Sequence, residues 1–171
     1  MAFTFHGIAV GLRDLGMTMN PQGAHYTLMG IETLPLRMEK HVANAEAIAK
    51  WLETHPAVSA VTYGGLDSSP YKYRVAKICP KGAGALFTVS LKGGYEACTK
   101  FVGALKLFSH VANLGDAGSL VIHPASTTHR QLSPEQQIAA GAAPDTVRLS
   151  IGIEGVEDLK ADLDQALNAV M

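Results

Sequence analysis

The hydrophobic pattern of this chain changes its period several times, and that alternation restricts the possible folds more than any other feature. Apolar residues at helical spacing predict an amphipathic helix over Leu34–Glu53, which ends at His55-Pro56 because the residue before a proline avoids helical geometry. Other helices are predicted over Tyr95–Leu105, from the capping box Ser133-Pro134-Glu135-Gln136 onward, and over Val156–Val170; strands are predicted over Val58–Tyr63, Leu86–Leu91, Ser119–Ile122 and Val147–Ile153. Strands separated by helices predict an α/β domain with helices packed on a sheet.

Length and composition exclude several classes of protein. The 171 residues suit about one domain, and fifteen acidic against fourteen basic residues argue against a nucleic-acid partner. The sequence has no run of 18 apolar residues, so no membrane-spanning helix is expected. Charged residues make up only 17% of a chain that is 47% hydrophobic, which indicates that part of the apolar surface is an interface.

Cysteines and histidines point to neither a disulfide framework nor a metal centre. Cys79 and Cys98 have no CxxC spacing, and the N-terminus has no secretory leader pattern, so reduced thiols and a cytoplasmic protein are expected. His123 and His129 share a loop without a third ligand at metal-site spacing, and structural or surface roles are favoured for them. The hydroxyls at Ser126-Thr127-Thr128 define no catalytic triad.

Arg148 is the residue that most suggests chemistry. It lies in the run Val147–Ile153, which otherwise has the composition of a core strand. A guanidinium is costly to bury unless an anion meets it, and its fork of donors suits a carboxylate held by two-point contact. From spacing alone, a structural salt bridge explains Arg148 as well as a ligand site does.

Several longer motifs resemble one enzyme family. They are Gly30–Leu34, Arg37-Met38, Leu107–Asp116, Ser119–His129 and Pro144–Glu154. In this order they are similar to the C-terminal domain of the Cys/Met-metabolism enzymes that depend on pyridoxal phosphate (PLP). Within that family, the sequence of residues 121–129 is most similar to that of the O-acetylhomoserine sulfhydrylases.

The resemblance implies a fold and a division of the chain. It implies the small C-terminal α/β domain of the aspartate-aminotransferase-type (fold type I) PLP enzymes, a mixed or antiparallel sheet with helices packed on it. Residues 1–32 are then a connecting helical segment and residues 33–171 the substrate-carboxylate-binding domain, with the N-terminal PLP-binding domain absent. None of the nine lysines stands in the family's Ser-x-Thr-Lys setting, so this chain is expected to lack the Schiff-base lysine and to be inactive alone.

The family's substrate site carries over residue by residue to part of this chain. Arg148 matches the arginine that binds the substrate's α-carboxylate, Asn113 and Leu114 match the pair beside it, and Thr128 matches a neighbouring hydroxyl. The resemblance implies no catalytic, cofactor-binding or metal-binding residue here. It implies replacement of acetate on O-acetylhomoserine by sulfide or a thiol, in methionine and homocysteine biosynthesis.

Two hypotheses from different classes follow. In the first, the chain works with an N-terminal PLP-binding half, separately encoded or cleaved, or with a full-length homologue, and forms a homo-oligomer when complete. In the second, it is a non-catalytic domain, either a degenerate remnant or an interaction module that pairs with homologues. Neither hypothesis involves nucleic acid or a membrane.

Overall fold

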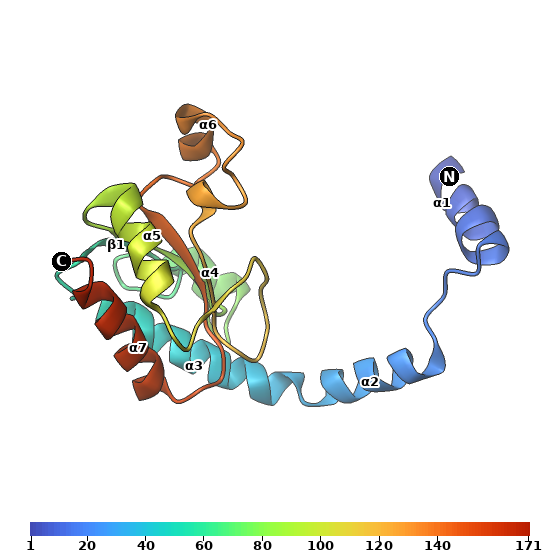
Figure 1. The fold of residues 1–171 in the computed structure, drawn as a ribbon. Helices are drawn as coiled ribbons and strands as arrows, with labels where there is room; N and C mark the ends of the chain where they lie inside the picture. Colours follow the sequence, from blue (N-terminus) through green and yellow to red (C-terminus); the bar gives the residue numbers. More distant parts are fainter. The chain divides into compact units, whose positions relative to one another are not determined.

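The computed structural model describes residues 1–171, which form two units, Met1–Leu36 and Arg37–Met171. The first unit contains α1 (Ala2–His6), the π-type helix η1 (Gly7–Asp14) and α2 (Pro21–Glu32) (Figure 1). Asn20 begins α2 by accepting the Gly23 N–H on its side chain at 2.7 Å, with Pro21 at the first helical position. These three helices bury no residue, so the first unit has no core of its own.

The second unit is built on a five-stranded sheet in the order β1-β2-β5-β4-β3. Its strands are β1 (Val58–Thr62), β2 (Leu86–Leu91), β3 (Ser109–His110), β4 (Leu120–Ile122) and β5 (Thr146–Ser150). Neighbouring strands are antiparallel except β3 and β4, which are parallel. The sheet is therefore mixed, as predicted.

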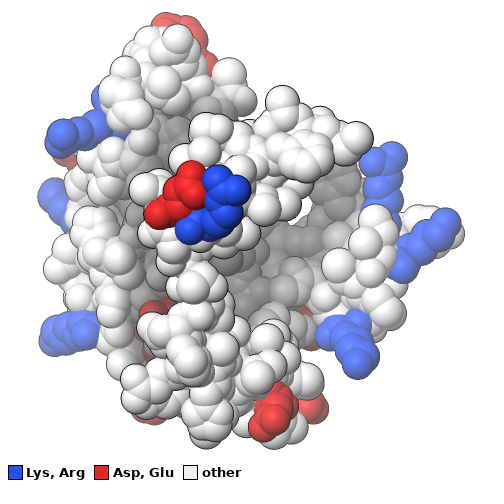
Figure 2. Space-filling model, turned by 90° about the vertical axis from the view of Figure 1, so that its right-hand side faces the viewer, with Lys and Arg blue, Asp and Glu red and all other residues white.

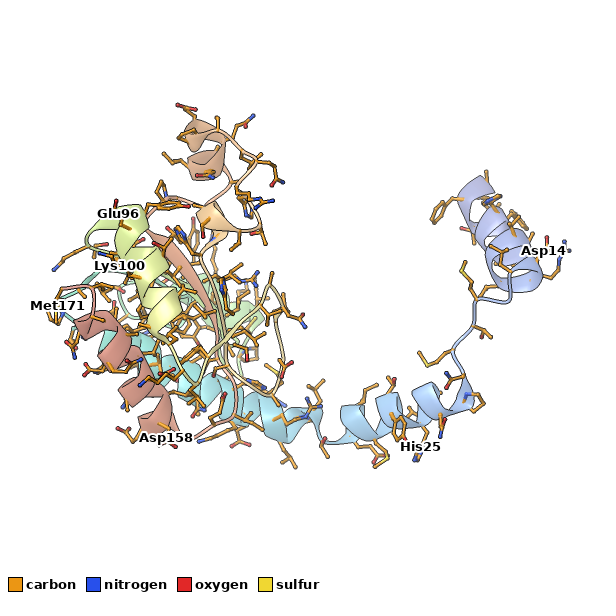
Figure 3. All side chains as sticks on the ribbon, viewed as in Figure 1. Asp14, His25, Glu96, Lys100, Asp158 and Met171 are labelled. Carbon is orange, nitrogen blue, oxygen red and sulfur yellow. The ribbon has the colours of Figure 1, made fainter.

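Three long helices supply the core against this sheet. Helices α3 (Leu34–Leu52), α5 (Gly94–Ala104) and α7 (Val156–Asn168) lie along one side of the strands (Figure 1). Most of the largest fully buried side chains come from these helices and from the strand positions that face them: Ile48, Leu52, Val89, Leu91, Phe101, Leu149, Leu159, Leu163 and Leu167. Each such side chain contributes about 1.5–3 kcal/mol by leaving water. Glu96, Lys100 and Asp158 extend from the exposed sides of α5 and α7 (Figure 3).

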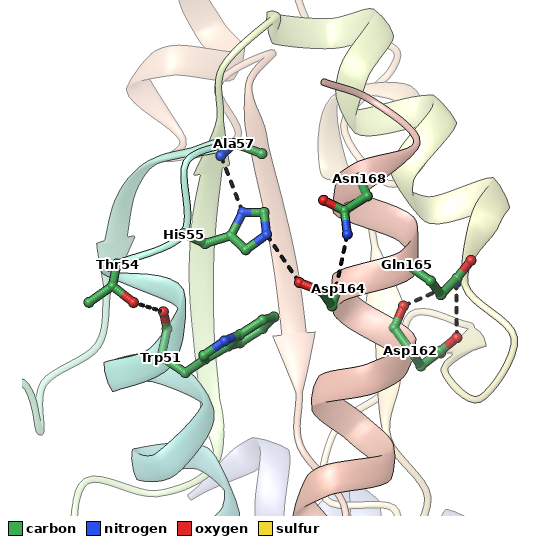
Figure 4. Close-up of polar contacts among 8 residues, drawn as sticks. All are labelled: Trp51, Thr54, His55, Ala57, Asp162, Asp164, Gln165 and Asn168. Atoms are coloured by element: carbon green, nitrogen blue, oxygen red, sulfur yellow. Dashed lines mark hydrogen bonds and ion pairs between the residues drawn. The ribbon is translucent and has the colours of Figure 1, made fainter.

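Two polar contacts tie α7 to other parts of the domain, and Figure 4 shows the one between His55 and Asp164. The Asp162 carboxylate accepts hydrogen bonds from the backbone N–H groups of residues 106–108. His55 accepts the Ala57 N–H on Nδ1 at 3.2 Å, so Nε2 carries the ring hydrogen and faces Asp164 Oδ1 at 3.4 Å. These contacts hold the α5–β3 connection and the α3–β1 turn on α7.

The short elements show where local pattern succeeds and where it fails. Helix α6 (Pro134–Ala139) begins at the predicted capping box, with the Ser133 and Gln136 side chains each accepting the other's backbone N–H. Helix α4 (Lys72–Ile78) was not predicted; it buries no residue, so it has no apolar stripe to detect. Strand β3 was also missed, since its two residues are recognisable only through pairing with β4. None of the helices combines the length and apolar character needed to cross a bilayer.

Candidate substrate-carboxylate site

Arg148 lies at the centre of β5 on the face of the sheet away from the three long helices. Its neighbours in the strand, Val147 and Leu149, are fully buried on the helix side, whereas Arg148 is half-buried. In the register, Arg148 pairs with Thr88 of β2 and Ile122 of β4. The period of two along β5 thus explains how a charged residue stands in a core strand: it belongs to the opposite face.

The Arg148 guanidinium has no carboxylate partner. Its Nη2 donates a hydrogen bond to the backbone carbonyl of Asn113 at 2.9 Å, and all four ion pairs of the structure involve other residues. The structural salt bridge considered from the sequence is therefore not formed. The remaining N–H groups of the guanidinium fork are available for an anion held by two-point contact.

Asn113 and Leu114 lie in the loop of residues 111–118 that joins β3 to β4. The Asn113 side-chain oxygen accepts the N–H of Leu114 at 2.9 Å, and the Asn113 N–H donates to the Val111 carbonyl at 3.0 Å. Arg148 thus meets the main chain of Asn113, while the Asn113 side chain shapes the loop. The Leu114 side chain is exposed.

Thr128 follows the 3₁₀ turn η2 (Pro124–Ser126), outside the Arg148–Asn113 contact. Its hydroxyl is hydrogen-bonded to Nδ1 of His129 at 2.8 Å, and its side chain is exposed. The structure therefore brings Arg148 to Asn113, with Leu114 beside Asn113 in the loop, and leaves Thr128 in a separate loop.

His123 is a buried structural residue. Its Nε2 lies 2.8 Å from the Pro144 carbonyl oxygen, which can only accept, so Nε2 carries the hydrogen and Nδ1 is left to accept from the Ser126 hydroxyl at 2.9 Å. Burial lowers the pKa of His123. The Tyr95 ring packs edge-on against the imidazole, with 4.9 Å between the ring centroids. Both ring nitrogens are occupied, and no group of three or more potential metal ligands forms in the structure.

Glu154 and Ser119 belong to this region, although the sequence analysis gave them no role. The Glu154 carboxylate accepts the Ser119 N–H at 2.6 Å and the Ser119 hydroxyl at 2.9 Å. Both residues stood within the quoted motifs, but they are 35 positions apart, and no local pattern connects them.

Charged side chains are sparse on the face displayed in Figure 2, where other residues cover most of the surface. A half-buried guanidinium with a carbonyl partner and no counter-ion has N–H groups left for an anion such as a carboxylate.

Comparisons with known proteins identify the family to which the sequence is similar. The sequence pattern of the family described as "Cys/Met metabolism PLP-dependent enzyme" matches residues 4–168. The chain is 51% identical over 167 residues to O-acetyl-L-homoserine sulfhydrylase 1 of Thermus thermophilus, covering 98% of this chain and 40% of that protein. It is 46% identical to the O-acetyl-L-homoserine sulfhydrylase of Leptospira meyeri, covering 99% of this chain and 39% of the relative. The chain thus spans about 40% of the length of these curated relatives and corresponds to their C-terminal part.

A solved structure shows the same fold. A protein of Campylobacter jejuni assigned as an O-acetylhomoserine (thiol)-lyase, crystallised with a pyridoxyl-lysine monophosphate group, superimposes with a TM-score of 0.87 at 44% identity. The match covers 98% of this chain and 40% of that one. The fold is the C-terminal α/β domain of fold type I PLP enzymes, as predicted. On its sequence and its fold, the chain belongs to the Cys/Met-metabolism family of PLP-dependent enzymes.

Proposed function

We propose that this chain supplies the substrate-carboxylate half-site of a PLP-dependent O-acetylhomoserine sulfhydrylase. The observation that carries the proposal is the Arg148 guanidinium, which bonds to the Asn113 carbonyl and to no carboxylate. The sulfhydrylase identity of relatives at 46% and 51% identity supports the choice of reaction. The proposed reaction replaces the acetate of O-acetylhomoserine with sulfide or a thiol.

In this proposal Arg148 binds the α-carboxylate of the amino-acid substrate through two parallel N–H···O bonds. The Asn113 carbonyl holds the guanidinium from the other side, so its plane is set before the substrate arrives. Leu114, the neighbour of Asn113 in the same loop, is proposed to flank the carboxylate, whereas Thr128 lies in a separate loop and is given no contact with it here. Fixing the carboxylate orients the Cα–H bond for proton removal, which is the contribution of this chain to the reaction.

The residues of this chain fit the substrate and not the cofactor. No lysine stands in the Ser-x-Thr-Lys setting, so the Schiff-base lysine is assigned to the N-terminal part of the relatives that this sequence does not match. When bound there, PLP supplies an electron sink for the chemistry at Cα and Cγ. The chain alone is therefore proposed to be inactive, and to act with that N-terminal half in a homo-oligomer.

A chimera tests this function. This chain replaces the matching C-terminal part of the Thermus thermophilus relative, and homocysteine formation from O-acetylhomoserine and sulfide is measured. An active chimera is expected, in which Arg148→Ala raises the KM for O-acetylhomoserine about 100-fold, the loss of two charge-assisted hydrogen bonds. Arg74→Ala, at an exposed arginine of α4, is the matched control and leaves the KM unchanged. An unchanged KM in Arg148→Ala refutes the role given to Arg148.

A non-catalytic interaction domain is the second candidate. The unit Met1–Leu36 favours it, because large apolar side chains there are exposed, among them Phe3, Leu15, Met17, Tyr26 and Leu28. An inactive chimera that folds and still binds PLP favours this candidate. Absorbance of the purified chain before and after borohydride separates the two further, since a bleached yellow colour requires an attached PLP-bearing half.

A further inference from the structure

The loop of residues 111–118 carries the carbonyl that orients Arg148, and it is fixed mainly at its far end. There the Ala117 carbonyl accepts the N–H of Ile153 at 2.9 Å, and Ser119 follows directly. Ile153 lies in the segment that continues from β5, the strand of Arg148. The C-terminal end of the loop is thus bonded to the segment after β5. Nearer its start, the Asn113 carbonyl of the same loop contacts Arg148.

Both carboxylate oxygens of Glu154 strengthen this attachment by accepting hydrogen bonds from Ser119. Oε1 accepts the Ser119 N–H, and Oε2 accepts the Ser119 hydroxyl, which in turn accepts the Gly152 N–H at 2.8 Å. Ser119 is 1% exposed, so these bonds are shielded from water. The direction of each hydrogen bond is set, because the hydroxyl has one hydrogen to donate and the carboxylate can only accept.

The segment that bears Glu154 is itself held from behind by α3. His41 Nδ1 lies 2.6 Å from the Ile151 carbonyl, and the Asn44 amide donates to the carbonyls of Gly152 and Glu154 at 3.0 and 2.9 Å. Loop and segment meet so closely that a Cβ on Gly152 would lie 2.7 Å from the Gly118 carbonyl carbon. The backbone around Glu154 is therefore fixed by α3, and the Glu154 carboxylate in turn fixes Ser119 at the end of the loop.

We propose that Glu154 is a positioning residue for the Arg148 half-site. By holding Ser119 it fixes the loop, and the loop's Asn113 carbonyl is the hydrogen-bond partner that orients the guanidinium. Without that partner, Arg148 has to be ordered when the substrate binds, which weakens binding about tenfold. The inference rests on the proposed function for the identity of the bound anion; the geometry of loop and guanidinium is tested separately.

The first test uses the 171-residue chain with Glu154→Gln, which keeps the shape and removes one acceptor. Glu157→Gln is the matched control, because Glu157 is exposed and contacts only Lys160 at 3.0 Å. We expect hydrogen exchange at the Ile153 N–H to accelerate about tenfold in Glu154→Gln, with averaging of the Arg148 guanidinium NMR signals, while the control matches wild type. Unchanged Ile153 and Arg148 signals overturn the proposal. So does equal acceleration at the strand amides of Val89 and Leu149, which marks a purely global loss of stability.

The second test uses the chimera. Glu154→Gln is expected to raise the KM for O-acetylhomoserine about tenfold with little change in kcat, because Glu154 touches no reacting atom. If Arg148→Ala raises the KM and Glu154→Gln does not, the positioning role is overturned and the proposed function stands. If Arg148→Ala leaves the KM unchanged, the proposed function fails, and the exchange experiment alone decides whether Glu154 orders the loop.

Discussion

Substitution of Asp162 should destabilise the fold strongly, although Asp162 is an acidic residue on the helix α7. Its side chain is 8% exposed and its oxygens accept the N–H groups of Lys106 at 3.0 Å and Leu107 at 2.8 Å, with Gln165 donating at 3.1 Å (Figure 4). In Asp162→Asn, one oxygen becomes an NH₂ group that faces N–H donors. The substitution therefore removes the charge and leaves at least one buried N–H group without an acceptor.

The magnitude follows from these contacts. A hydrogen bond to a charged group contributes about 1.5–3 kcal/mol and a neutral one about 1 kcal/mol. Replacing two charged bonds with one neutral bond lowers the free energy of unfolding by about 2–5 kcal/mol. Asp164→Asn is the control on the same helix: its side chain is 51% exposed and its ion-pair contact with His55 spans 3.4 Å, so the loss should stay below about 1 kcal/mol.

Urea unfolding measures the free energy of unfolding of both variants. Trp51, the only tryptophan, lies on α3 with its ring 5.5 Å from that of His55, so its fluorescence reports the second unit, and far-UV circular dichroism provides an independent signal. The m-value should stay at the wild-type value, because the surface exposed on unfolding does not change. A loss in Asp162→Asn within about 1 kcal/mol of that in Asp164→Asn would refute the reasoning.

Two further predictions follow from buried groups. Because burial lowers the pKa of His123 below its usual value of about 6.5, the unfolded chain binds the extra proton, and the free energy of unfolding should fall as the pH drops below about 6.5 towards the folded pKa. Between pH 7 and pH 5, the midpoint temperature of thermal unfolding should fall less with pH in His123→Gln than in the wild type. The same fall in both proteins would contradict this account. Burial, reinforced by nearby Asp145, raises the pKa of Cys98 to about 12, whereas Cys79 is exposed. Ellman's reagent should therefore titrate one fast thiol per folded chain, absent in Cys79→Ser, and two fast thiols would show the burial argument to be wrong.

Much of the fold could be predicted because its larger elements have a strong local pattern. The predicted strand Leu86–Leu91 has the same bounds in the structure, and the helix predicted to begin at Leu34 ends at Leu52, one residue earlier than expected. The run Val147–Ile153 is shorter as a strand, ending at Ser150. Beyond Ser150 the backbone is held by side chains of α3 and by the Ser119 hydroxyl, contacts that no strand pattern records.

The sequence by itself determined the type of most elements, the capping of α6, the family motifs and Arg148 as the candidate ligand residue, because each depends on residue chemistry or on short-range periodicity. Only the tertiary structure decided the strand order and the loss of the salt-bridge alternative for Arg148. It also decided that Asn113 contacts Arg148 through its main chain and that Glu154 contacts Ser119. These contacts join residues about 35 positions apart, and such pairs meet only after loops close and strands choose neighbours, which local hydrophobic periodicity does not encode.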